Sequence, residues 1–263
     1  MSVKKNSHDL HGSAPEKSDT AILLIDVIND MEFPRGKALL RFATKAAERI
    51  AKLKKRARQA GIPVVYVNDN FGRWKSDFRR IVDHCLQDEI AGKSVAKLLL
   101  PSEEDYFVLK PKHSGFFSTS LDILLNYLGA SKLILCGFAG DICVLYTAND
   151  AYMRDYDLVI PRDCIASETK VGNDLALQHM KRFLRADVRN SAASDLRQKL
   201  PGIRKNRSAA KADALHPNRR DEGVSRRGRM HSVHRPIDAR MLSQGFFKSG
   251  VEIHHRIGLV LGP

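Results

Sequence analysis

The chain has 263 residues, with 44 Lys or Arg and 30 Asp or Glu, so its formal net charge is +14. It contains no run of about 18 apolar residues, which excludes a membrane-spanning helix. The polar start lacks the apolar stretch of a secretory signal, so we expect a cytoplasmic protein. Residues 191–263 hold 15 Lys or Arg and 6 Asp or Glu, a net charge of +9. We therefore expect any nucleic-acid binding to be weak, non-specific and confined to this tail.

Strands and helices are predicted to alternate from about residue 19 onwards. The first strand is a continuous apolar run that ends at Asp26, as is typical of a strand buried on both faces of a parallel sheet. Ser120 is a candidate N-cap residue for the helix that begins there. The expected strands are 21–25, 63–67, 106–109, 132–136 and 158–161, with a short sixth at 186–188, and the expected helices are 37–60, 78–86, 120–128, 141–154 and 174–184.

This alternation predicts an α/β fold with a mostly parallel sheet and right-handed crossovers. The pattern divides the chain into three parts: a disordered leader at 1–18, one domain at 19–190, and a basic, largely disordered C-terminal tail at 191–263. The tail has neither the helical nor the strand period over most of its length, and too few apolar residues to build a core.

Four cysteines are present, at positions 85, 136, 143 and 164. They form no C-x-x-C pair, so a disulfide framework and a zinc site are both disfavoured. A buried, structural thiol is the default interpretation for each of them. Cys143 is the exception, because it follows a Gly-rich turn and falls in the first turn of a predicted helix.

Ligands of an open parallel sheet bind beyond the carboxyl ends of the strands. This rule places five sequence positions on one rim, namely Asp26, Asp69, Lys110, the turn 137–143 and Asp163. A helix N-terminus and a nearby lysine are both expected to lower the pKa of the Cys143 thiol, and an aspartate within reach could exchange its proton. From the residues alone, Cys143 could also be structural, Lys110 or Lys112 could be solvated, and Asp26 could cap a turn or pair with a lysine.

Several known motifs are absent from the sequence. No G-x-G-x-x-G follows the first strand, and there is no phosphate-binding loop of the G-x-x-x-x-G-K-[ST] type, so nucleotide binding is disfavoured. The G-x-S-x-G elbow of serine hydrolases is absent too.

Residues 19–190 resemble the isochorismatase-like cysteine hydrolases, a superfamily that includes nicotinamidases, N-carbamoylsarcosine amidohydrolases and ureidoacrylate amidohydrolases. The first strand with Asp26 is similar to the family's block for the catalytic aspartate. In the family's lysine block the catalytic lysine lies four residues before a serine, which selects Lys110 over Lys112. The matching blocks, in order, are 21–26, 109–116, 136–144 with 147–151, and the segment with Asp163 and Ser167.

The resemblance implies a three-layer, Rossmann-like fold with a six-stranded parallel sheet and an Asp26–Lys110–Cys143 triad. It also implies a non-proline cis peptide between Phe138 and Ala139, which aims the N–H groups of Ala139 and Cys143 at the substrate oxygen. We expect Phe138 and Ala139 to belong to this oxyanion and substrate site.

Three departures from the family pattern refine the expected activity. Many members have Gln where this chain has Ile28. The metal-binding nicotinamidases have an Asp-x-His pattern where this chain has Asp69-Asn70-Phe71, so we expect no metal and disfavour nicotinamidase activity. Isochorismatases of siderophore synthesis do not use the cysteine that matches Cys143, so its presence favours cleavage of C–N bonds over vinyl ethers.

Further residues near the rim are candidate substrate contacts. The aromatic side chains Phe33, Phe71, Trp74 and Phe117 could line a pocket or could simply pack at the rim. Asp69 and Asn70 could contact substrate or satisfy the backbone of a turn.

The sequence predicts a metal-independent amidohydrolase that needs no cofactor, acts on a small amide or carbamoyl compound, and forms a homo-oligomer by resemblance to the family. The alternatives are an isochorismatase-type hydrolase of another small molecule, a nucleic-acid-binding protein acting through its tail, and a non-enzymatic interaction protein on the same fold.

Overall fold

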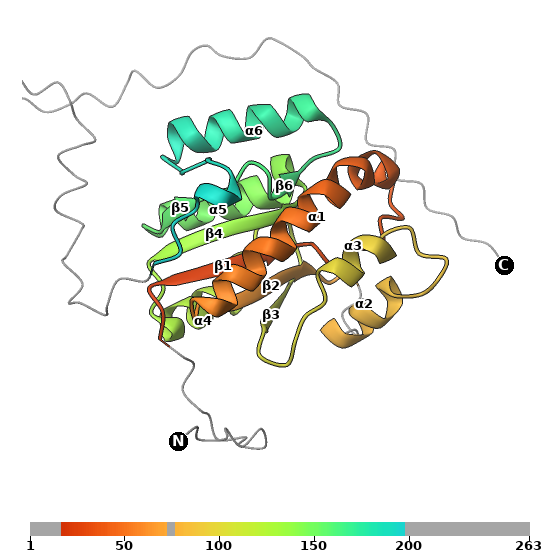
Figure 1. Ribbon diagram of the computed structural model, residues 1–263, viewed down its shortest axis with the longest axis horizontal. Coiled ribbons are helices and arrows are strands. Elements are labelled where there is room, and N and C mark those ends of the chain that lie inside the picture. Colours follow the sequence, from red (N-terminus) through yellow and green to blue (C-terminus); the bar gives the residue numbers. More distant parts are fainter. Residues whose placement is uncertain (1–16, 73–76, 198–263) are drawn as a thin grey trace, which may run out of the picture. The chain divides into compact units, whose positions relative to one another are not determined.

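The sheet of this protein consists of six parallel strands. The structure, a computed structural model, describes residues 17–72 and 77–197 (Figure 1). The strands run in the order β3-β2-β1-β4-β5, and β6 pairs with the far end of β4. Their bounds are β1 Thr20–Ile25, β2 Val64–Asp69, β3 Tyr106–Lys110, β4 Lys132–Phe138, β5 Asp157–Val159 and β6 Ile165–Ala166. The three-layer α/β fold expected from the sequence is therefore confirmed.

Strand β1 lies at the centre of the sheet and feeds two separate cores. All six of its residues are buried. Ala21, Leu23 and Ile25 belong to one core cluster, whereas Ile22 and Leu24 belong to the other. Successive side chains of a strand point to opposite faces, so a strand covered by helices on both sides is apolar throughout. This explains why apolar and polar residues do not alternate along the sequence of β1.

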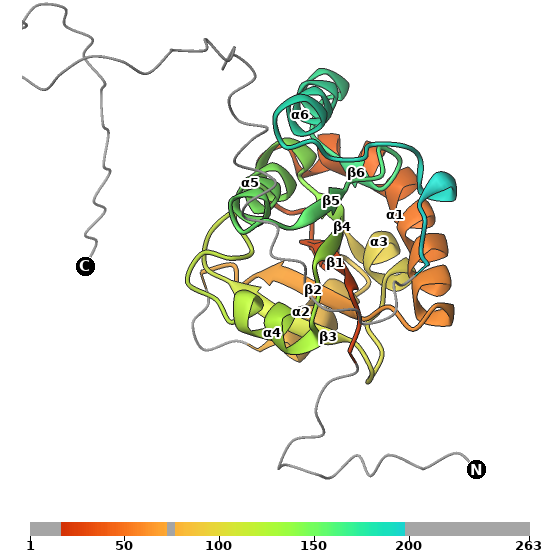
Figure 2. The same cartoon turned by 90° about the vertical axis from the view of Figure 1, so that its left-hand side faces the viewer.

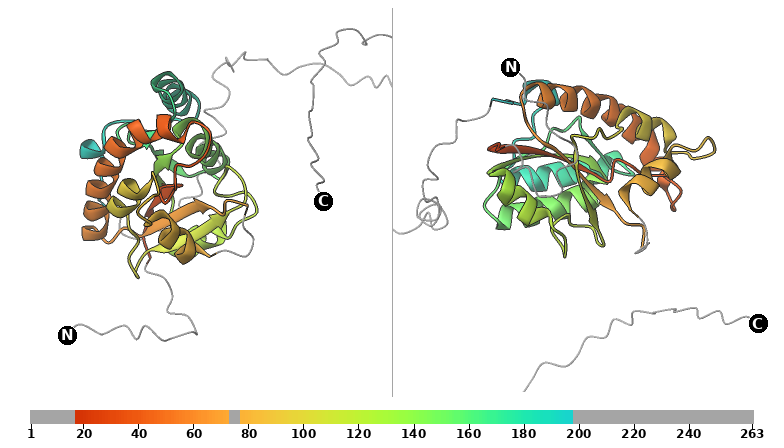
Figure 3. Two further views of the ribbon diagram at one scale, coloured as in Figure 1. Left: turned by 90° about the vertical axis from the view of Figure 1, so that its right-hand side faces the viewer. Right: turned by 90° about the horizontal axis from the view of Figure 1, so that it is seen from below.

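Helices cover both faces of the sheet. The core of one face includes side chains of α1, α2 and α3, and the core of the other includes those of α4, α5 and α6. Figure 2 shows α1 and α3 on one side of the strands and α5 on the other, and Figure 3 gives two further views of this layering. The bounds are α1 Gly36–Gln59, α2 Phe78–Cys85, α3 Lys93–Leu98, α4 Leu121–Leu128, α5 Leu145–Met153 and α6 Lys170–Phe183, with a π-helical turn η1 Gly140–Val144 before α5.

The structure corrects three local predictions. The sixth strand lies at Ile165–Ala166, while the segment proposed for it makes only a single bridge, between Asp187 and Val159. Helix α3 was not predicted. Ser120 precedes α4 as expected, but its side chain makes no capping hydrogen bond.

The described part of the domain extends beyond both expected boundaries. At the start, Ser18 is buried and its backbone N–H donates to the Leu128 carbonyl at 2.8 Å. At the end, the short 3-10 helix η2 Ser191–Ala193 and the residues after it contact the guanidinium of Arg56, which donates to the carbonyls of Ser191 and Ser194. The rest of the predicted leader and tail lies outside the described residues.

Within the part of the chain that the structure describes, no helix is both long enough and apolar enough to cross a membrane.

Candidate active site

Three side chains from three different strand ends meet at the carboxyl edge of the sheet. Asp26 follows β1, Lys110 is the last residue of β3, and Cys143 lies in the turn η1 after β4. The Lys110 Nζ is 2.8 Å from the Asp26 Oδ2 and 3.6 Å from the Cys143 Sγ. The three residues expected to form a triad are therefore brought together, and the Lys110 ammonium contacts both the acid and the thiol.

The choice between Lys110 and Lys112 follows from burial. Lys110 is completely buried, whereas the Lys112 side chain is exposed and its carbonyl accepts a hydrogen bond from the Lys110 Nζ at 3.2 Å. Strand β2 separates β3 from β1, so the long side chain of Lys110 passes over the end of β2 to reach Asp26. A buried ammonium of this kind requires charged partners, and Asp26 and Asp69 provide them.

Burial and charge act in opposite directions on these groups. Burial raises the pKa of Asp26, and the Lys110 ammonium offsets part of this effect. Burial disfavours the charged form of Lys110, but its interactions with Asp26, Cys143 and Asp69 outweigh this effect, so the pKa of Lys110 is raised. The pair is thus charge-balanced, with a carboxylate that binds a proton more readily than an exposed aspartate does.

The expected lowering of the Cys143 thiol pKa is wrong. Burial, together with the Asp26 charge, raises the pKa of this thiol well above its usual range, and Lys110 offsets only part of the shift. This environment therefore favours the neutral thiol of Cys143 over the thiolate. A nucleophile in this state needs a proton acceptor at the moment of attack, and Asp26 with its raised pKa is suited to that task.

The loop that carries Asp26 is held by a buried amide. The Asn68 side chain receives a hydrogen bond from the Ile28 N–H at 3.3 Å and donates one to the Ile28 carbonyl at 2.7 Å. Ile28 itself is fully buried in the core on the α1 side, so its side chain does not face a substrate. Asp26 has a left-handed backbone with φ 51°, a conformation that such tertiary bonds help to maintain.

The turn that carries Cys143 requires close contact between β4 and β1. Gly137 has φ 126°, and a Cβ there would collide with the carbonyl oxygen of Ile25 on the neighbouring strand. The peptide between Phe138 and Ala139 is cis, as the family resemblance implied. The Asp141 N–H donates to the Ser167 Oγ at 3.0 Å, and this hydroxyl in turn donates to Asn173. Side chains of the segment after β6 and of α6 thus support the nucleophile turn.

Asp69 and Asn70 both accept a backbone N–H of the turn, Asp69 from Phe71 at 2.7 Å and Asn70 from Gly72, and Asp69 has a second role as well. The Asp69 Oδ2 lies 3.6 Å from the Lys110 Nζ, and its backbone N–H donates to the Asp26 Oδ1 at 2.6 Å, so this residue is part of the charged cluster. The Asn70 Oδ1 accepts from the Gly72 N–H at 2.9 Å. For Asn70, the structure therefore favours the turn-stabilising interpretation.

Among the other residues predicted for the site, the phenylalanines at 33, 71 and 117 are exposed, as rim residues would be. Their roles as substrate contacts stay predictions, and Trp74 lies outside the described residues. Phe138 is only 1% exposed because its ring lies in the core on the α1 side. Any contribution of Phe138 to the site must therefore come from its backbone.

Asp163 has a structural task. Its two carboxylate oxygens accept hydrogen bonds from the Ser191 N–H at 2.7 Å and from the Ser191 hydroxyl at 2.8 Å. The strand-end rule placed Asp163 on the rim with the other charged residues, but its carboxylate anchors the start of the predicted tail.

One residue at the site was not predicted. His113 follows Lys110 by three residues, and its Nδ1 lies 3.8 Å from the Cys143 Sγ. Its ring packs at a tilt against Tyr146, with 5.5 Å between the ring centroids. The sequence did contain a signal, because His113 lies in the loop directly after the strand that ends with Lys110.

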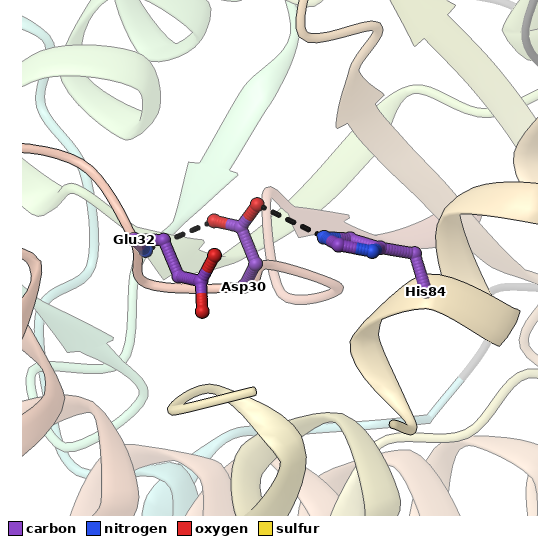
Figure 4. Close-up of side chains that lie close together, drawn as sticks. All are labelled: Asp30, Glu32 and His84. Carbon is purple, nitrogen blue, oxygen red and sulfur yellow. Dashed lines mark hydrogen bonds and ion pairs between the residues drawn. The ribbon is translucent and has the colours of Figure 1, made fainter. Parts of the chain in front are cut away.

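Metal-ligating residue types come together in two places of the described chain. In the 69–71 stretch, Asp69 is paired with Lys110 and Phe71 supplies no donor, so these residues do not form the Asp-x-His pair of a metal site. Elsewhere, donor atoms of Asp30, Glu32 and His84 lie within 4.8 Å of one another (Figure 4). The His84 Nε2 is 3.4 Å from the Asp30 Oδ2, and the Glu32 N–H donates to the Asp30 Oδ1 at 3.0 Å.

Comparisons with known proteins identify the family to which the chain is similar. The sequence model of the Isochorismatase domain family matches residues 20–192. The chain is similar to the isochorismatase family protein YaaI of Bacillus subtilis, with 42% identity over 172 residues that cover 65% of this chain and 94% of YaaI. It is also similar to the ureidoacrylate amidohydrolase RutB of Acinetobacter baylyi, with 30% identity over 168 residues that cover 54% of this chain and 68% of RutB.

A solved structure is similar to this chain in fold. The N-carbamoylsarcosine amidase of Thermoplasma acidophilum superposes with a TM-score of 0.53 at 28% identity, covering 70% of this chain and 99% of that enzyme.

Proposed function

The chain belongs to the isochorismatase family, and from this premise we propose that it is a metal-independent cysteine hydrolase that cleaves a C–N bond in a small amide, carbamoyl or ureido compound. The observation that carries the proposal is the buried Lys110 ammonium, which contacts both the Asp26 carboxylate and the Cys143 thiol. The amidase and amidohydrolase among the similar proteins act on substrates of this class, as their names state.

The first half of the reaction forms a thioacyl enzyme. The Cys143 Sγ attacks the substrate carbonyl carbon while the thiol proton passes to Asp26. The carbonyl oxygen becomes negative and is stabilised by the backbone N–H groups of Ala139 and Cys143. The tetrahedral intermediate then collapses, the C–N bond breaks, and the proton held by Asp26 goes to the leaving nitrogen.

Lys110 stabilises the negative charges that form during these reaction steps, and it does not itself transfer a proton. Its ammonium lies 2.8 Å from the acid and 3.6 Å from the sulfur, so it stays close to the negative charge as that charge passes between them. In the buried site such a fixed charge acts far more strongly than it would in water. In the second half, water adds to the thioester carbonyl carbon, the C–S bond breaks, and the acid product leaves.

The nucleophile is tested by screening small amides, carbamoyl compounds and ureido compounds with the wild type and the Cys143→Ser variant. We expect the best substrate to lose at least about 10³-fold in kcat/KM in the variant, because the hydroxyl is a far weaker nucleophile in the same position. Full activity of Cys143→Ser would rule out nucleophilic catalysis by this residue.

A matched pair of lysines tests the role of charge. Lys110→Met should abolish turnover because it removes the ammonium between the acid and the sulfur, whereas Lys112→Met should leave kcat/KM within a few-fold of the wild type. Equal losses in the two variants would contradict the assignment of Lys110.

Three predictions from the sequence concern other properties, namely nucleic-acid binding, oligomeric state and location. Nucleic-acid binding by the basic tail rests on residues that are mostly outside the described part of the chain. A homo-oligomer and a cytoplasmic location remain expectations that follow from the family resemblance and from the sequence.

A further inference from the structure

His113 contacts the sulfur of Cys143 from the exposed side of the site. Its Nδ1 lies 3.8 Å from the Sγ, and its side chain is exposed, whereas Lys110 is completely buried and Asp26 is only 5% exposed. Cys143 is half-buried between them. The sulfur therefore has charged partners on its buried side and an imidazole on the side that solvent can reach.

Asp26 lies deeper in the protein than His113, and both of its carboxylate oxygens have partners there. The Asp26 Oδ1 already accepts a hydrogen bond from the Asp69 N–H at 2.6 Å, and its Oδ2 is paired with Lys110 at 2.8 Å. A water molecule that attacks a thioester on the Sγ has to arrive from the exposed side, where His113 lies. Imidazole is suited to exchanging a proton near neutral pH.

We propose that His113 is a further catalytic residue, the general base of the water-attack step, while Asp26 serves the thiol in the first step. The proposal rests on the proposed role of Cys143 as the nucleophile. Water adds to the thioester carbonyl carbon and gives one proton to the His113 Nδ1. As the C–S bond breaks, the sulfur keeps the bonding pair and takes that proton, so the acid product leaves and the Cys143 thiol is restored.

This division of labour is tested with p-nitrophenyl acetate, which acetylates a reactive thiol and releases p-nitrophenolate. The burst of p-nitrophenolate reports the first step, and the steady-state rate reports removal of the acetyl group. In His113→Gln we expect the burst to persist while the steady-state rate falls at least about 10²-fold, the usual contribution of a general base. Intact mass spectrometry should then detect an acetyl group that accumulates on Cys143.

Two further variants make the test specific. His179→Gln removes an exposed histidine of α6 that packs at a tilt against Phe183, and it should behave as the wild type. In His113→Gly, added imidazole should restore removal of the acetyl group, after correction for the background rate measured with Cys143→Ala. Rescue of this kind requires a missing base and would not follow from a purely structural role.

The outcomes separate the two proposals. If the wild type is acetylated on Cys143 and His113→Gln removes the acetyl group at the wild-type rate, the role of His113 is refuted and the nucleophile stands. A burst and a steady-state rate that fall together, without acetyl accumulation, would refute it as well. If the wild type carries no acetyl group on Cys143, the proposed nucleophile fails and His113 fails with it.

Discussion

Replacing Lys110 by methionine would leave the Asp26 carboxylate in the protein interior without its main partner. Removing one member of a buried ion pair costs about 3–5 kcal/mol, because the remaining charge is desolvated and uncompensated. Lys110 is fully buried and Asp26 is 5% exposed, so this pair belongs to the buried class. In a domain of this size, 1 kcal/mol corresponds to about 2–4 °C in Tm. The variant should therefore unfold roughly 6–20 °C below the wild type.

The loss should depend on pH in a defined direction. Burial already raises the pKa of Asp26, and removal of Lys110 takes away the charge that offsets this effect. A carboxyl whose pKa is higher in the folded state than in the unfolded state favours folding at acid pH, and this contribution is lost as the pH rises through the folded pKa. The Tm difference between Lys110→Met and wild type should therefore be smaller at pH 5 than at pH 8.

Thermal unfolding followed by circular dichroism provides the measurement, and a double variant provides the control. Asp26→Asn/Lys110→Met lacks both charges of the buried pair, and only the more exposed Asp69 carboxylate remains nearby, so at pH 8 it should regain at least half of the Tm lost in the single variant. If the double variant is no more stable than Lys110→Met, the isolated charge is not the cause of the loss. Lost packing of the lysine stem would then be the explanation.

Four further outcomes are expected. Gly137→Ala should destabilise the fold by at least about 2 kcal/mol in urea unfolding, because its backbone conformation and the neighbouring strand exclude a Cβ; wild-type stability would contradict this. Thr169→Ala should cost about 1 kcal/mol, because its side chain caps α6, whereas Ser120→Ala, which removes no cap bond, should stay within about 0.5 kcal/mol; equal losses would refute the capping argument. Alkylation of Cys143 by iodoacetamide should keep accelerating into alkaline pH, since the pKa of this thiol is raised, and a plateau at neutral pH would oppose it. Turnover should fall at acid pH with an apparent pKa above that of an ordinary aspartate, because Asp26 must be ionised to accept a proton and burial raises its pKa; a profile flat down to pH 4 would contradict this.

The position of the site followed from strand ends alone. A buried apolar run that stops at Asp26 predicts a strand of a parallel sheet, and parallel strands present their carboxyl ends at one edge. The same logic applied to Lys110 and to the turn with Cys143. The order and direction of the strands are encoded by hydrophobic patterns that extend over many residues. Predictions based on them therefore remain correct when a strand boundary is misplaced by a few residues.

What the sequence did not predict depends on single tertiary contacts. Strand β6 has only two residues, too few for a hydrophobic period, and it exists because β4 offers a free edge beside it. The strand-end rule placed Asp163 at the rim, but it contains no information on the hydrogen bonds between Ser191 and this carboxylate.

The thiol pKa was misjudged for a related reason. The position of Cys143 near a helix start was visible in the sequence, but the depth of its burial was not, and burial is the larger effect. His113 was overlooked because its contact with the sulfur arises from the path of a loop.

The edge of β4 is shared by two short partners, and this has a dynamic consequence. Strand β5 pairs with residues 132–134 of β4, while β6 pairs only with Gly137 and Phe138, next to the turn with Cys143. Pairing in two separate segments allows the second to open while the first stays closed, as an opening smaller than global unfolding. Native-state amide exchange along β4 would then be faster towards Phe138 than at Ile134. The end of β4 next to Cys143 would then open locally while the rest of the fold stays intact.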